Sequence, residues 1–127
     1  IKKVIVKLND TLKTLLLEVA NRDDACKSVK GRFVTSIYYQ GDTTLDPGWR
    51  TIEPVAAGTT KRNNPVLRAW QREGASDTPQ RIPGWRFFRL DRITNFDQTL
   101  DTFDDVRPNF NPNGDKSMNQ VWCIAKF

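Results

Sequence analysis

Arginine and aromatic side chains alternate in the middle of this chain, and their spacing has a clear chemical use. Arg68, Trp70 and Arg72 occupy every second position of residues 65–72, so they share one face if this segment is a strand, with Leu67 and Ala69 on the other. Guanidinium groups hold phosphates, and an indole ring stacks on a nucleobase at roughly 1–3 kcal/mol per base. The pattern favours nucleotide or nucleic-acid binding. In the alternative, Trp70 packs under a flanking helix and both arginines are solvated.

Further arginines follow in the next predicted strand. Arg86, Arg89 and Arg92 recur at three-residue steps, which places Arg86 and Arg92 on one face and Arg89 on the other. Asp91 lies beside Arg92, so a purely structural ion pair, worth about 0–1 kcal/mol at a surface, is the alternative. The predicted ligand-binding residues are Arg50, Arg68, Trp70, Arg86, Arg89 and Arg92.

The composition argues against most kinds of enzyme. The chain contains no histidine, and so lacks the commonest general base and the commonest metal ligand. Cys26 and Cys123 are the only cysteines, too few for a zinc site of the usual Cys/His kind. Because they lie far apart and form no CxxC pair, we expect two reduced core thiols and therefore a cytoplasmic protein. We expect no catalytic activity, metal or cofactor.

One acidic set offers an alternative, a carboxylate–magnesium nuclease or other enzyme. Two-metal chemistry needs carboxylates that converge on the ions. The four aspartates would instead point along the solvent side of a helix, so a solvated face is favoured over a metal site. This set comprises Asp97, Asp101, Asp104 and Asp105.

The net charge of +5 and the pI near 9.5 suit a negatively charged partner. In residues 36–96, eight of the nine basic residues are arginine. No apolar run approaches the length of a membrane span, so no membrane association is expected. The expected partners are single-stranded DNA or RNA or a nucleotide, with a protein or a second copy of the chain as a further partner.

The hydrophobic pattern predicts a helical segment over residues 1–32. Asn9 or Asp10 would cap a first helix, whose apolar residues recur at three- and four-residue spacing. Residues 23–30 would extend or restart it, and Gly31 would end it. The apolar residues of the first helix are Leu12, Leu15, Leu16, Val19 and Ala20.

Strand patterns fill residues 33–96, and helical patterns fill residues 97–127. The four predicted strands cover residues 33–39, 49–55, 65–72 and 85–93. Phe96, Leu100 and Phe103 would share one helix face, and a short helix would follow from Asp115 or Ser117. We therefore expect one domain of the mainly β (α+β) class, a small, strongly bent antiparallel sheet or barrel flanked by N- and C-terminal helices.

The order of motifs resembles the WYL-domain family over residues 33–96. The matching segments are SIYYQG at 36–41, RTIEP at 50–54, VLRAW at 66–70 and GWRFFRLDRI at 84–93. In the namesake position the chain has Pro65-Val66-Leu67, so only the leucine is kept. The first 32 residues are too short for a helix-turn-helix module, which suggests a stand-alone WYL-like protein.

This resemblance implies an Sm-like or SH3-like β-barrel. It also implies a regulatory module of bacterial transcription factors or of phage-defence and CRISPR-type systems, with a basic pocket for nucleic acid or nucleotide-like ligands. By position, Arg50 matches the arginine of the RxxEP-like segment, and Arg89 and Arg92 match those of the FRLDRI-like segment. The alternative function is a protein-interaction or inhibitory accessory subunit of a nucleoprotein complex.

Overall fold

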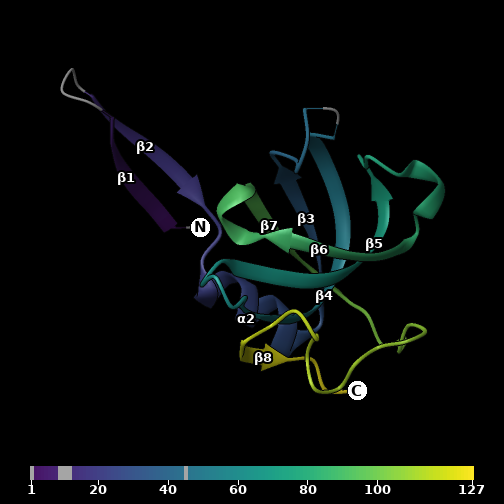
Figure 1. The fold of residues 1–127 in the computed structure, drawn as a ribbon. Coiled ribbons are helices and arrows are strands. Elements are labelled where there is room, and N and C mark those ends of the chain that lie inside the picture. The colour runs from purple at the N-terminus through teal and green to yellow at the C-terminus, as the bar shows by residue number, and fades with distance from the viewer. Residues whose placement is uncertain (1, 9–12, 45) are drawn as a thin grey trace.

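The structure is a computed structural model that describes residues 2–8, 13–44 and 46–127. Figure 1 shows a bent antiparallel sheet, with a helix packed against it and a hairpin that projects from the body. The elements are β1 (Lys2–Leu8), β2 (Lys13–Val19), α2 (Arg22–Gly31), β3 (Phe33–Tyr39), β4 (Gly48–Thr59), β5 (Pro65–Gly74), the 3₁₀ turn η1 (Pro79–Arg81), β6 (Gly84–Arg89), the 3₁₀ turn η2 (Leu90–Arg92), β7 (Ile93–Thr102) and β8 (Gln120–Ile124).

The main sheet has six strands and is built around β4. Its order is β6-β5-β4-β3-β7, and β8 also pairs with β4. The first half of β4 pairs with β3 and its second half pairs with β8, beyond a register shift next to Pro54. The prediction of a mainly β antiparallel fold is confirmed. The pairing does not join β6 to β7 among the described residues, so closure into a barrel stays a prediction.

The four predicted central strands are present, because their β-branched and aromatic residues fit a pleated sheet that is buried on one face. The fourth, predicted over residues 85–93, ends at Arg89, and residues 90–92 form η2 instead. Ile37, Ile52 and Leu67 are fully buried and form the core with Phe88 and Ile93. The helix α2 packs against β4, β8 and β3. One side of the sheet is therefore packed against α2. The other side, which we call the outer face, is contacted over β5 and β6 by connecting segments.

The predicted C-terminal helices are wrong. Residues 93–102 form β7, which pairs with β3 from Ile93↔Tyr39 to Thr102↔Phe33, and residues 120–124 form β8. Leu100, expected on the buried face of a helix, is 91% exposed. The free edges of β3 and β4 offered backbone hydrogen bonds to segments rich in threonine, valine and isoleucine, and this tertiary pairing overrode the helical spacing.

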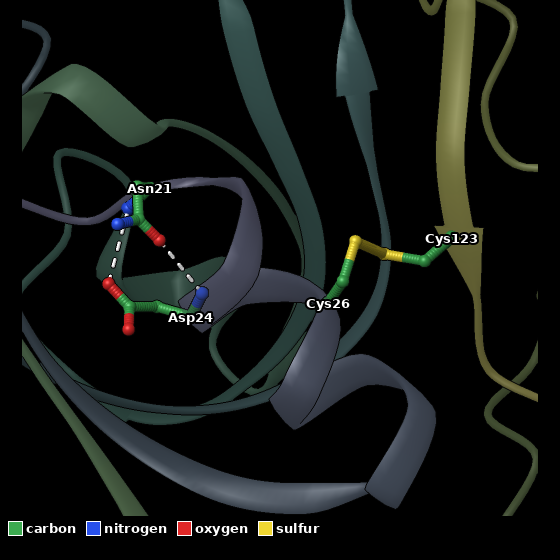
Figure 2. Close-up of a disulfide and its surroundings, with 4 residues drawn as sticks. All are labelled: Asn21, Asp24, Cys26 and Cys123. Carbon is green, nitrogen blue, oxygen red and sulfur yellow. Dashed lines mark hydrogen bonds between the residues drawn. A yellow bond between two sulfur atoms is a disulfide. The ribbon is translucent and has the colours of Figure 1, made fainter. Parts of the chain in front are cut away.

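The predicted helix that would begin after Asn9 or Asp10 is also wrong, whereas the helix predicted over residues 23–30 is confirmed. Residues 13–19 form β2, which pairs with β1 in a hairpin; the predicted caps Asn9 and Asp10 lie outside the described residues. The observed helix α2 begins after Asn21, whose side-chain oxygen accepts a hydrogen bond from the N–H of Asp24 at 2.9 Å. The Asp24 carboxylate accepts the N–H of Asn21 in return, which completes a capping box (Figure 2).

Cys26 and Cys123 form a disulfide, which corrects the prediction of two reduced thiols. Their Cα atoms lie 5.7 Å apart although 97 positions separate them in sequence. Figure 2 shows the bond joining α2 to β8. The cytoplasmic prediction rested on reduced thiols and so loses its basis. Within the described part of the chain, no helix has the length and apolar character needed to cross a membrane.

Candidate ligand pocket on the outer face of β5 and β6

The alternation predicted for β5 is confirmed. Leu67, Ala69 and Gln71 are fully buried, whereas Arg68 and Trp70 are partly exposed on the opposite face. Residues of β6 stand directly opposite these two, with Phe87 facing Arg68 and Trp85 facing Trp70. The outer face therefore carries an aromatic and basic surface.

The aromatic rings and the arginines of this face are stacked in one row. Trp70 and Trp85 pack edge to face with their ring centroids 5.4 Å apart. The guanidinium of Arg68 lies over the Trp85 ring at 5.4 Å, and that of Arg107 lies over the Trp70 ring at 5.3 Å. Each such cation–π interaction stabilises by about 0.5–1 kcal/mol at an exposed site. The Trp70 ring is thus covered by the Arg107 guanidinium.

The buried carboxylate of Glu53 fixes the position of Arg107 at one end of this row. Glu53 of β4 is fully buried and binds Arg107 through both carboxylate oxygens, at 3.0 and 2.7 Å, and Arg72 at 2.6 Å. Burial alone would raise the pKa of Glu53, but the hydrogen bonds from Arg107 and Arg72 outweigh burial and hold this pKa below its ordinary value. Glu53 therefore stays ionised and anchors the segment that contains Arg107.

Residues 107–117 rise over this surface and enclose a pocket of about 430 Å³. The Trp85 indole N–H donates to the carbonyl of Pro108 at 2.6 Å, and Arg68 forms an ion pair with Asp115 at 3.3 Å. These interactions tie the segment to β5 and β6. We call this hollow the aromatic pocket; its lining includes Arg68, Trp85, Phe87, Asn109, Asn111, Asp115, Lys116 and Ser117.

The lining of the aromatic pocket combines charged, aromatic and amide groups. Its volume falls within the roughly 300–1,000 Å³ of small-molecule sites. Two cationic side chains, Arg68 and Lys116, stand against the single carboxylate of Asp115. The rings of Trp85 and Phe87 provide apolar surface, and the asparagine amides can donate and accept hydrogen bonds.

Arg50 lies elsewhere and is no surface residue. It is 3% exposed and pairs with the equally buried Asp46 at 3.1 Å, while its guanidinium lies over the rings of Tyr39 and Phe88. Burial alone would raise the pKa of Asp46, but hydrogen bonds from Thr43 and Arg50 hold it below its ordinary value. The structure thus gives Arg50 a core ion pair.

Arg89 and Arg92 surround the hydroxyl of Tyr39, each paired with an aspartate. Arg89 binds Asp91 through two nitrogens, at 3.0 and 2.6 Å, and Arg92 pairs with Asp42. The Tyr39 hydroxyl donates to Asp42 at 2.8 Å and accepts the backbone N–H of Arg89 at 3.0 Å. Burial, reinforced by the bond to Asp42, raises the pKa of Tyr39 to about 12, so this hydroxyl stays protonated.

Arg86 lies apart from both groups. It stands opposite Ala69, on the inner face of β5–β6, and pairs with Asp77 at 3.3 Å. Of the six predicted residues, the structure brings Arg68 and Trp70 together and leaves Arg86 apart. The other three, Arg50, Arg89 and Arg92, lie around the Tyr39 side chain or its partner Asp42. The six residues thus do not form one group, and each of the five arginines is paired with an aspartate. Ligand binding by these residues stays a prediction.

The acidic set of residues 97–105 does not form a cluster. Asp97 and Asp101 are exposed on β7, and Asp104 pairs with Arg32 at 3.4 Å. The described residues contain no group of three or more histidine, cysteine or acidic side chains placed to hold a metal ion.

Several pocket residues were missed because they come from segments predicted only as turns or helix ends. Asn109 and Asn111 lie in the turn cluster before Gly114, and Lys116 follows it. Gly114 has a φ of 105°, in the left-handed region that favours glycine. The asparagine-rich turn was visible in the sequence, but its approach to β6 depends on long-range packing that no local pattern encodes.

The fold is similar to that of proteasome accessory factor B/C (PafBC) of Arthrobacter aurescens. The similarity has a TM-score of 0.56 at 22% sequence identity and covers 72% of this chain. The chain corresponds to only 13% of the length of that protein. No protein-family model matches the sequence, and no curated protein matches it. PafBC contains a WYL domain, so the likeness agrees with a WYL-like fold; at this identity it concerns the fold alone.

Proposed function

We propose that this chain is a non-catalytic regulatory module of the WYL-like type, which binds a nucleotide-like anion or single-stranded nucleic acid in the aromatic pocket. One observation carries the proposal: two cations, Arg68 and Lys116, and two aromatic rings, Trp85 and Phe87, line the same hollow. Cations attract a phosphate, and rings stack on a base. The motif resemblance to WYL domains is what suggests a place in transcription regulation or phage defence.

Ligand binding in the aromatic pocket can act directly on residues 107–117, the segment that covers it. Arg68 is shared between the Trp85 ring and Asp115, and Asp115 belongs to the segment that covers the pocket. A phosphate that reaches Arg68 competes with the Asp115 carboxylate for the same guanidinium. Occupancy would therefore loosen the hold of residues 107–117 on β5, which is a local change that a partner protein could detect.

The charge balance of the pocket provides the test. Arg68→Ala should weaken binding of a labelled single-stranded oligonucleotide about tenfold, the effect of losing one charge-assisted hydrogen bond. Asp115→Asn should strengthen binding about threefold, because it removes the competing charge and keeps the oxygen that accepts the N–H of Ser117. Fluorescence anisotropy measures both.

Arg81→Ala is the matched control, since Arg81 is exposed and lies outside the aromatic pocket. It should leave the affinity unchanged. Equal affinity in wild type, Arg68→Ala and Asp115→Asn, or no binding of any nucleotide or oligonucleotide by the wild type, contradicts the proposed function.

A second candidate function, a protein-interaction subunit, is favoured by one hollow along β8. It measures about 600 Å³ and is lined by Val121, Trp122 and Ile124 between Lys30 and Lys126. This role predicts protein partners that survive nuclease treatment of a pull-down and are lost from Val121→Asp. Partners that disappear with nuclease in the wild type contradict it.

A further inference from the structure

A third hollow lies between the β4–β5 turn and residues 116–119, and none of the predicted arginines lines it. It measures about 570 Å³, and its cationic residues are Lys61, Arg62 and Lys116. Thr60 and Ser117 add hydroxyl groups to its wall. No carboxylate is among the described residues that line it. We call this hollow the basic hollow.

The positive charge of the basic hollow is not neutralised within the described structure. Every arginine of the predicted site has an aspartate partner, whereas Lys61, Arg62 and Lys116 form no ion pair with any described residue. Lys61 and Arg62 are exposed. Three unpaired cations around one concave surface create a positive potential that attracts a polyanion.

The walls of the basic hollow are fixed by the backbone. In the β4–β5 turn, Thr60 donates its N–H to Asn64 at 3.0 Å, and Asn63, with a φ of 64°, donates to Thr60 at 2.8 Å. On the other wall, the N–H of Asn119 donates to the carbonyl of Thr59 at 2.6 Å. Since both walls are held before a ligand arrives, little ordering entropy opposes binding.

The aromatic pocket and the basic hollow share one wall. Lys116 and Ser117 line both the aromatic pocket and the basic hollow. A ligand that extends past these two residues passes from the rings of Trp85 and Phe87 to the cations Lys61 and Arg62. The chemistry therefore changes along the surface from base-stacking to phosphate-binding, which matches a chain of nucleotides.

We propose that the basic hollow is a phosphodiester subsite, which holds the backbone of a single-stranded nucleic acid whose first nucleotide occupies the aromatic pocket. The inference rests on the proposed function and narrows it, because it selects an oligonucleotide of two or more units over a free mononucleotide. Lys116 stands at the junction, and Lys61 and Arg62 hold the next phosphate.

The test compares ligands of different length with two matched double variants. The probes are thymidine monophosphate, a labelled tetrathymidylate and a labelled double-stranded DNA, with the uridine counterparts of the first two as the RNA arm. Lys61→Ala/Arg62→Ala removes two charges from the basic hollow. Lys27→Ala/Lys30→Ala removes two charges from α2, where both lysines are exposed, and serves as the control. Anisotropy is measured across a series of salt concentrations.

We expect the Lys61→Ala/Arg62→Ala variant to bind the tetranucleotide about tenfold more weakly at low salt, and the monophosphate as the wild type does. The slope of log affinity against log salt should become shallower by about 0.7 for each phosphate that the variant no longer neutralises. The control variant should retain the wild-type affinity and slope.

Three results would overturn the inference. The first is an unchanged tetranucleotide affinity and slope while Arg68→Ala still weakens monophosphate binding; the proposed function then stands without the subsite. The second is equal weakening of both ligands, which would place the cations in the mononucleotide site. The third is double-stranded DNA that binds as tightly and with the same sensitivity to the variants, the behaviour of a non-specific basic surface.

Discussion

Glu53 determines where two of the arginines near the aromatic pocket can lie. It is fully buried on β4, directly opposite Trp70, and both Arg72 and Arg107 reach it. Arg107 in turn covers the Trp70 ring. Breaking a buried ion pair by removing one partner generally costs about 3–5 kcal/mol. A residue with no access to ligand therefore sets the geometry of the surface beside the pocket.

Replacement of Glu53 by glutamine should lower the free energy of unfolding by about 3 kcal/mol at pH 7, the lower end of the range for a broken buried pair. The lower end applies because Arg72 and Arg107 keep 41% and 28% of their side-chain surface exposed. The pKa of Glu53 is lowered by folding, so the stability that its charge contributes is present above the ordinary value of 4.5 and is lost as pH falls through the folded-state pKa.

The difference between wild type and Glu53→Gln should therefore narrow as the pH falls below about 4.5. Urea unfolding at pH 7 and at successively lower pH values measures it. Glu73→Gln, an exposed neighbour on β5, should show almost no difference at any pH. A difference between wild type and Glu53→Gln that stays constant with pH would show that the charge of Glu53 is not what stabilises the fold.

At the level of single residues, the sequence showed which face of the sheet a side chain occupies but not which residue it pairs with. The alternation of β5 correctly placed Arg68 and Trp70 on the outer face. Their partners could not be found, because Asp115 and Arg107 come from distant segments that meet β5 only in the folded chain. Local spacing does not show which carboxylate will reach a guanidinium, so the aspartate partners of the predicted arginines were not foreseen.

Among the elements, β8 is short and therefore gains little stability from its own strand pairing. It has five residues, pairs only with β4 among the described strands, and contains a register shift beside Val121. The disulfide from Cys123 to Cys26 adds a covalent link to α2. Because residues 103–119 connect β7 to β8, this link also fixes the far end of the segment that closes the aromatic pocket.

Removing the disulfide should destabilise the protein strongly. In the chain-entropy account, a crosslink that closes a loop of about 100 residues contributes about 4–5 kcal/mol, and Cys26 and Cys123 are 97 positions apart. We expect Cys26→Ala/Cys123→Ala to lose up to that amount in urea unfolding. It should also bind oligonucleotides more weakly, because the covering segment is less restrained.

Reducing agent provides the control for the cysteine variant. It should lower the stability of the wild type toward that of Cys26→Ala/Cys123→Ala and leave the variant itself unchanged. A wild type whose unfolding midpoint is the same with and without reductant would contradict a stabilising role for the disulfide.

The elements that were predicted correctly are those whose residues favour one structure strongly. β3 contains Val34, Ile37 and two tyrosines in seven residues, and it was found with its observed bounds. The errors fell on β2, β7 and β8, whose apolar residues fit both a helical and an extended spacing. In these segments the partner strand decided the outcome, and partner strands lie outside any local window.

The whole molecule divides into a crosslinked body and a projecting hairpin. The six-stranded sheet, α2 and the disulfide all lie within residues 20–127. The hairpin of β1 and β2 forms a sheet of its own and adjoins the body where β2 meets β7 and η2 (Figure 1). The backbone N–H of Ala20 donates to the carbonyl of Ile93 at 3.0 Å, which marks the junction.

A chain that begins at Ala20 should therefore fold and retain the proposed site. An isolated two-stranded hairpin contributes little stability in water, whereas the body keeps its core, its helix cap and its disulfide. We expect the thermal unfolding midpoint to shift by no more than about 3 °C, and tetranucleotide affinity to equal that of the full chain. Calorimetry and anisotropy measure the two quantities. A shortened chain that folds normally but loses nucleotide binding would show that the hairpin belongs to the ligand site, and one that fails to unfold cooperatively would show that the body depends on it.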